Sequence, residues 1–157
     1  MSPVKIYLDT SIPNFALSTR EESMQKATHE LIKAIKKGKY QPFISSTVID
    51  EIKDTTDLKR REALLEKIDA VNPQSLKITP KIRKLASRYI ERKIIPKKYH
   101  ADAVHLAAAS HYKIPIVVSW NFKHLVKPET RRGVNEINKK LGYPQIDIVS
   151  PFELVGV

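Results

Sequence analysis

The chain of 157 residues has no cysteine. Without thiols it can form neither a disulfide framework nor a thiolate zinc site. A protein of this composition usually works in a reducing, intracellular compartment.

Glycine and long apolar runs are also scarce. The chain has four glycines and no glycine-rich phosphate loop, which makes a phosphatase-like or nucleotide-binding domain the poorer interpretation. No stretch approaches the roughly 18 apolar residues that a membrane span needs, and the first residues resemble no signal peptide. We therefore expect a cytoplasmic protein.

Positive charge is abundant. The chain carries 28 Lys and Arg against 17 Asp and Glu, a formal net charge of +11. This balance suits a polyanion such as RNA, because neutralised phosphates release counterions. Lysines lie on almost every amphipathic segment, so a generic basic surface is the alternative. With 41% hydrophobic residues, residues 1–157 are expected to form one globular domain.

Strand and helix patterns alternate along the chain. Strands are expected at residues 4–8, 41–45, 76–78, 116–119 and 146–149, of which the third is a minor candidate. Between them, apolar residues at helical spacing predict helices over residues 21–37, 48–52, 57–69, 80–90, 101–112 and 129–141. This alternation predicts an α/β fold with a parallel sheet.

Polar side chains stand where sites form in such sheets, at the carboxyl ends of the strands. Asp9 follows the first strand, Glu51 lies one turn beyond the second, Asp102 opens the helix before the fourth, and Asn121 follows that strand. Each residue alone has an ordinary interpretation: a cap or turn for Asp9, Asp102 and Asn121, and a solvated helix residue for Glu51.

Together, carboxylates that converge from separate segments repel one another and imply a bound cation. Oxygen ligands without cysteine suit hard ions such as Mg²⁺ or Mn²⁺, which keep waters for a substrate phosphate. This arrangement is typical of phosphodiester hydrolysis.

Four segments carry a more specific resemblance. Residues 7–11 (YLDTS), 44–51 (ISSTVIDE), 101–107 (ADAVHLA) and 118–122 (VSWNF) look like the motifs of the PIN domain, in the family's order and spacing. Residues 148–154 also resemble the family's last strand and following turn, so the likeness spans nearly the whole chain.

The resemblance implies a Rossmann-like three-layer α/β/α sandwich with a central parallel sheet. It also implies Mg²⁺ or Mn²⁺, cleavage of single-stranded or structured RNA, and Asp9, Glu51 and Asp102 as an acidic triad. Many relatives carry a fourth Asp where this chain has Asn121, which keeps an oxygen ligand but removes a charge. The hydroxyl residues expected to support the ligands or position water are Thr10, Ser11, Ser46 and Ser119.

Other residues near these motifs are further candidates for a role in the site. His105 could be a metal ligand or base, but its apolar helix favours a satisfied, partly buried histidine. Trp120 and Phe122 could stack on RNA bases, although packing in the core is the favoured interpretation. Lys98 and Lys123 are candidates for phosphate contacts.

Small single-domain PIN proteins are most often toxins of toxin–antitoxin pairs, and the chain resembles the VapC-like toxin ribonucleases among them. This likeness implies a homodimer and a small antitoxin partner. The alternatives are an RNA-processing nuclease and a catalytically weak RNA-binding module, which the missing fourth acid makes conceivable.

Overall fold

Strands and helices alternate along residues 2–155, the part of the chain that the computed structural model describes. The strands are β1 (Val4–Leu8), β2 (Tyr40–Ser45), β3 (Gln74–Leu76), β4 (Ile116–Val118) and β5 (Asp147–Val149). The helices are α1 (Ser11–Ala16), α2 (Glu22–Lys36), α3 (Ser46–Lys53), α4 (Leu58–Val71), α5 (Pro80–Glu91), α6 (His100–His111), α7 (Pro128–Leu141) and α8 (Pro151–Val155), with a 3₁₀ turn η1 (Lys97–Tyr99) before α6.

The strands form one sheet in the order β3-β2-β1-β4-β5, and every neighbouring pair is parallel. The first strand, β1, lies in the middle of the sheet, and the strand order reverses between β1 and β4. Parallel sheets of this kind leave a crevice beyond the carboxyl ends of the strands where the order reverses. The expected parallel α/β fold is therefore confirmed, and the end of β1 becomes the natural place for a site.

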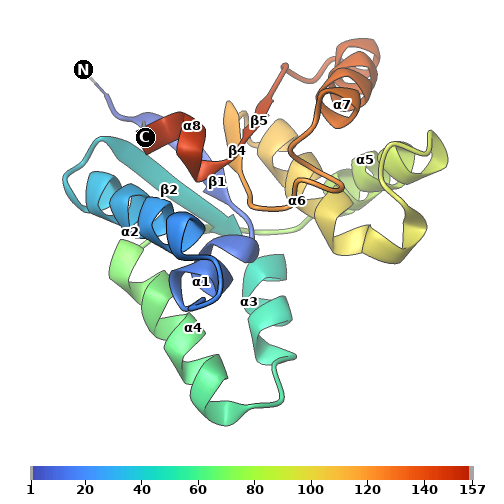
Figure 1. The fold of residues 1–157 in the computed structure, drawn as a ribbon. Coiled ribbons are helices and arrows are strands. Elements are labelled where there is room, and N and C mark those ends of the chain that lie inside the picture. The colour runs from blue at the N-terminus through green and yellow to red at the C-terminus, as the bar shows by residue number, and fades with distance from the viewer. Residues whose placement is uncertain (1, 156–157) are drawn as a thin grey trace.

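Two helical layers cover the sheet, one on each face (Figure 1). We call α5, α6 and α7 the α5 layer; they pack on strand residues that include Tyr7, Phe43 and Val117. We call the helices α1 to α4 and α8 the α2 layer; they pack on the alternate strand residues, among them Ile6, Ile44 and Val118. This alternation gives the three-layer α/β/α sandwich implied by the family resemblance.

Helix ends follow the local chemistry expected from the sequence. The Thr79 hydroxyl accepts from the Ile82 amide at the start of α5, whose first residue is Pro80. The left-handed conformation of Gly142 (φ 80°) ends α7. The Ser45 hydroxyl, which accepts from the Thr47 amide, starts α3 directly after β2.

One predicted strand is displaced, and one predicted turn is a helix. β3 covers Gln74–Leu76 instead of residues 76–78, because pairing with β2 ends at Leu76 while Ile78 packs against the core beyond the strand. Residues 151–155 form α8 where a turn was expected. The Glu153 carboxylate accepts from the Ser150 amide ahead of Pro151, a capping arrangement that the sequence already contained.

Within residues 2–155, no helix has both the length and the apolar character needed to cross a membrane.

Candidate active site

Asp9 is the first site residue, placed directly after β1 and almost fully buried, with 3% of its surface exposed. One carboxylate oxygen accepts from the amide and hydroxyl of Ser11, and the other accepts from the hydroxyl of Ser119. Burial raises the pKa of Asp9, although His105 and these hydrogen bonds oppose the shift. The carboxylate is therefore fixed in position but poorly solvated, which favours binding to a cation.

Glu51 reaches the same place from α3. Its Oε1 accepts from the Thr10 hydroxyl at 2.6 Å and from His105 Nε2 at 2.7 Å, while the side chain is 36% exposed. Burial would raise the pKa of Glu51, but the hydrogen bond and charge of His105 outweigh it and lower that pKa. Glu51 is thus held as a carboxylate at the opening.

A buried chain of hydrogen bonds lies behind Glu51. His105 Nδ1 lies 2.6 Å from the Tyr7 hydroxyl, which lies 2.7 Å from the Ser45 hydroxyl. Burial would lower the pKa of His105, but Glu51 and the other carboxylates raise it, and burial keeps Tyr7 protonated by raising the pKa of that phenol. A protonated His105 then donates to Glu51 and Tyr7, and Tyr7 donates to Ser45.

His105 was expected to be a satisfied, partly buried histidine; both ring nitrogens have partners, as expected, but the side chain is fully buried, with 1% exposed. Its contact with Glu51 was not anticipated. The available signal was its position three residues after Asp102, which places both side chains on one face of α6.

Asp102 and Asn121 complete the group. Asp102 lies in the first turn of α6; burial, followed by the charges of Asp9 and Glu51, raises its pKa to about 6. Asn121 Nδ2 donates to Asp102 at 3.2 Å, and Asn121 Oδ1 accepts from the His124 amide at 2.9 Å. The Asn121 oxygen, which was expected from the sequence to bind a cation, accepts from the His124 amide. The Asn121 side chain therefore presents its NH₂ group, a donor, to Asp102.

These side chains line one open pocket beyond the ends of β1 and β4. Its lining consists of Asp9, Thr10, Ser11, Asn14, Glu51, Asp102, His105 and Asn121. Among residues 2–155, no group of three or more His, Asp or Glu side chains is close enough together to hold a metal ion. Mg²⁺ generally binds through one or two carboxylates and keeps several waters, so the hard, mutually repelling oxygens of this pocket fit such an ion.

The sequence of residues 5–123 matches that of a known family, the PIN domain. The chain belongs to the PIN domain family. Membership supports a nuclease function, and it confirms the resemblance that the four motif segments carried.

Two solved structures share the fold of this PIN domain. VapBC2 from Rickettsia felis, solved with a DNA fragment from its promoter, matches with a TM-score of 0.59 and 14% identity over 94% of this chain and 98% of that one. The PIN domain endonuclease Utp24 matches with a TM-score of 0.51 and 18% identity over 94% of this chain and 85% of that one. No protein of curated function matches the sequence closely enough to count as a relative.

The remaining predicted residues of this PIN domain lie in different surroundings. Thr10, Ser11 and Ser119 bond to the acids, but Ser46 is exposed and outside the pocket lining, and its neighbour Ser45 makes the inward contact instead. The difference lies at the junction of two elements, because Ser45 is the buried last residue of β2 and Ser46 is the exposed first residue of α3.

The aromatic pair divides in the same way. Trp120 is buried and its Nε1 donates to Thr28, so the core interpretation is confirmed for it. The core interpretation is wrong for Phe122, which is 47% exposed. Lys98 and Lys123 are exposed and outside the pocket lining, each on a segment that contributes a site residue.

Proposed function

We propose that this PIN domain is an endoribonuclease that uses Mg²⁺ or Mn²⁺ bound by Asp9, Glu51 and Asp102. The observation that carries the proposal is that three carboxylates from the end of β1, from α3 and from α6 open into one pocket. Their mutual charge contributes to raising the pKa of Asp102, a cost that a divalent cation would remove.

The chain's own side chains hold these acids in place. Ser11 and Ser119 orient Asp9, Thr10 and His105 orient Glu51, and Asn121 donates to Asp102. When bound, Mg²⁺ or Mn²⁺ supplies activation of water for attack on the phosphodiester and offsets the charge that develops in the transition state. Lys98 precedes Asp102 in the sequence and Lys123 follows Asn121. These two lysines are proposed to bind phosphates without reading bases.

The cellular role belongs to the same proposal. The likeness to VapBC2 and the small size of the chain support a toxin that forms a homodimer and is controlled by a small antitoxin. An RNA-processing nuclease is the alternative. A catalytically weak RNA-binding module is a further candidate, favoured by Asn121, whose amide stands where a fourth acid would add charge.

Replacement of Asp9 by Asn tests the proposal most directly. Asn keeps the oxygen that accepts from Ser11 and removes the charge, so the fold should survive. Loss of one ligand should remove several kcal/mol of transition-state stabilisation, and cleavage of single-stranded RNA in Mg²⁺ or Mn²⁺ should fall by roughly a hundredfold or more. Wild-type cleavage should also stop in EDTA.

The matched control is Asp57→Asn. Asp57 caps α4 through the amides of Lys59 and Arg60, and Asn caps about equally well, so this variant should cleave like the wild type. Thermal unfolding in EDTA is measured to check that both variants fold. Wild-type cleavage by a folded Asp9→Asn protein would contradict the proposed site.

A further inference from the structure

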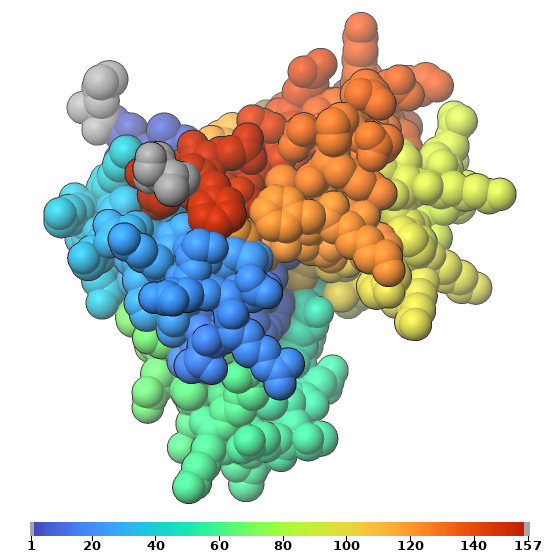
Figure 2. All heavy atoms as spheres, viewed as in Figure 1, coloured from blue at the N-terminus to red at the C-terminus, as the bar shows by residue number. Residues whose placement is uncertain are grey.

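Almost all of the net positive charge of the chain lies in one part of the sequence. Residues 74–145 contain 16 Lys and Arg and 4 Asp and Glu, whereas residues 2–73 contain 12 and 11. The basic stretch includes the whole α5 layer. In Figure 2 its yellow-green and orange segments form the right-hand part of the molecule, where long side chains project outward.

Three cations of α5 and its C-cap residue, Arg92, form a row on one side of the helix. Lys81, Lys84, Arg88 and Arg92 follow one another at intervals of three or four residues, and all four are exposed. The row is about 16 Å long at the rise of an α-helix. Like charges at this spacing repel, and Arg88 alone among them has an ion-pair partner within residues 2–155, the exposed Glu91.

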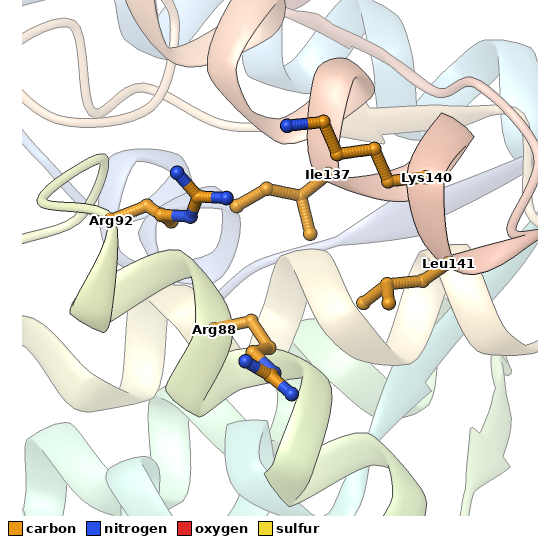
Figure 3. A pocket seen from close by; sticks show the side chains of 5 residues that line it. All are labelled: Arg88, Arg92, Ile137, Lys140 and Leu141. Atoms are coloured by element: carbon orange, nitrogen blue, oxygen red, sulfur yellow. The ribbon is translucent and has the colours of Figure 1, made fainter.

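This row is one wall of a groove whose other wall is α7. Three adjoining hollows share Arg88, Arg92, Lys140 or Leu141, so together they form one continuous groove. Figure 3 shows the middle hollow, with arginines on the α5 side and Ile137, Lys140 and Leu141 on the α7 side. The groove therefore combines basic walls with apolar surface and one carboxylate, that of Glu136 at the Arg92 end, and we call it the α5–α7 groove.

The groove has a direction relative to the acid pocket. At one end Lys81 and Lys84 lie with Tyr143, beyond the end of α7. At the other end Arg92 lies with Gly133, where α7 and the segment after α5 lie so close that a Cβ on Gly133 would lie 2.8 Å from Ile94.

The end at Arg92 is the nearer one to the acid pocket along the chain. The chain continues from there through η1 into α6, whose first turn carries Asp102. At the junction, the ring of Tyr99 from η1 stacks on that of His124, whose amide is bonded to Asn121. The groove and the acid pocket nevertheless share no lining residue.

We propose that the α5–α7 groove binds the phosphate backbone of the RNA strand whose scissile phosphate lies in the acid pocket, an inference that rests on the proposed function. Several cations without carboxylate partners match a polyanion, and the apolar surface of Leu141 and Tyr143 suits sugars and bases. A second copy of the chain would set one basic face against another. The groove contributes affinity that depends on RNA length and salt concentration.

The test compares two matched pairs of lysines. Lys81→Gln/Lys84→Gln removes two charges from the groove end distant from the acid pocket, and Lys36→Gln/Lys37→Gln removes two exposed charges from the end of α2. Binding of fluorescent single-stranded RNAs of about 6 and about 20 nucleotides is measured by anisotropy in EDTA, at several salt concentrations. Cleavage of both RNAs is measured separately in Mg²⁺.

We expect the groove variant to bind the long RNA on the order of tenfold more weakly at physiological salt, with the salt slope reduced by about 1.4. Its binding and cleavage of the short RNA should equal those of the wild type. The control variant should bind both RNAs like the wild type.

Three outcomes would overturn the groove assignment. The first is unchanged binding of the long RNA by the groove variant, and the second is an equal loss of RNA affinity in the groove and control variants. The third is a groove variant that loses affinity for polyglutamate, an acidic polypeptide, while its RNA binding stays intact. The last would assign the groove to an acidic protein partner. If the wild type cleaves neither RNA while the groove variant still loses affinity for the long one, the groove stands and the proposed nuclease function fails.

Discussion

The two helical layers of this PIN domain have similar architecture but different charge. The α2 layer, apart from α8, lies in residues 2–73, which have nearly equal numbers of acids and bases, whereas the α5 layer lies in residues 74–145, which have four bases for each acid. The acid pocket lies where the layers meet, with Asp9 and Glu51 from the first stretch and Asp102 from the second. The difference agrees with the two proposals, which assign cleavage to the seam between the layers and RNA affinity to one layer.

The largest effect that sharpens this comparison is expected from Asp102→Asn. Asp102 is the one acid of residues 74–145 in the pocket lining, and its removal should lower RNA cleavage by roughly a hundredfold or more. The same change should stabilise the protein without metal. Burial raises the pKa of Asp102 to about 6, so its charged form opposes folding above the pKa of the unfolded chain.

The sign of this effect sets its pH dependence. Below about pH 4 the carboxyl is neutral in both states and the variant gains nothing; the gain grows as pH rises to about 6 and then remains constant. Thermal unfolding in EDTA at pH 4 and pH 7 should show a melting temperature raised by a few degrees at pH 7 alone. An equal melting temperature at pH 7 would mean that Asp102 is not desolvated as the structure indicates.

A smaller effect is expected from two buried tyrosines, each of which belongs to its own network of buried hydrogen bonds. The Tyr7 hydroxyl links Ser45 to His105 behind Glu51, and the Tyr89 hydroxyl links Ser110 to Asn138 inside the α5 layer. Tyr7→Phe and Tyr89→Phe should each cost about 1–3 kcal/mol of stability, since each leaves buried partners unpaired. We expect only Tyr7→Phe to lower kcat as well, by about tenfold with KM unchanged, because His105 would no longer be held against Glu51.

Urea unfolding and steady-state cleavage of one RNA substrate separate the two effects. Equal kcat in the two variants would show that the network behind Glu51 has a structural role and does not position the acid. A fall in kcat for Tyr89→Phe would contradict the comparison, because the network of Tyr89 shares no residue with the pocket lining.

Much of the fold could be predicted because its signals are local. The alternation of Val4, Ile6 and Leu8, the β-branched run at β4 and the glycine after α7 each specify an element within a few residues. β3 and α8 were misjudged because tertiary pairing decides where a three-residue strand ends, and because a five-residue helix has little periodicity.

The site was predictable in its positions but not in its contacts. Strand ends indicated where Asp9 and Asn121 would lie, yet no local pattern specifies that His105 reaches from α6 to Glu51 on α3, a separation of 54 residues. The charge asymmetry was present in the sequence from the start. Lysines are spread along the whole chain, and it is the distribution of acids that makes one layer basic.

The smallest effect is expected from Asn121→Asp, which moves one more acid to the basic side of the pocket. Asp keeps the oxygen that accepts from the His124 amide but replaces the donor to Asp102 with a second charge. Without metal the two carboxylates repel, and the melting temperature in EDTA should fall by about 2–4 °C, as for a loss of roughly 1 kcal/mol. With Mg²⁺ the added charge strengthens cation binding, so the thermal shift caused by Mg²⁺ should exceed that of the wild type, and cleavage should stay equal or rise severalfold. Asn135→Asp is the matched control, since Asn135 bridges the Ile146 backbone in the α5 layer and lies outside the pocket lining. Its melting temperature should fall without any additional response to Mg²⁺. A Mg²⁺ shift in Asn121→Asp no larger than that of the wild type, or a loss of cleavage that high Mg²⁺ does not restore, would show that position 121 serves the turn at His124 and not the cation.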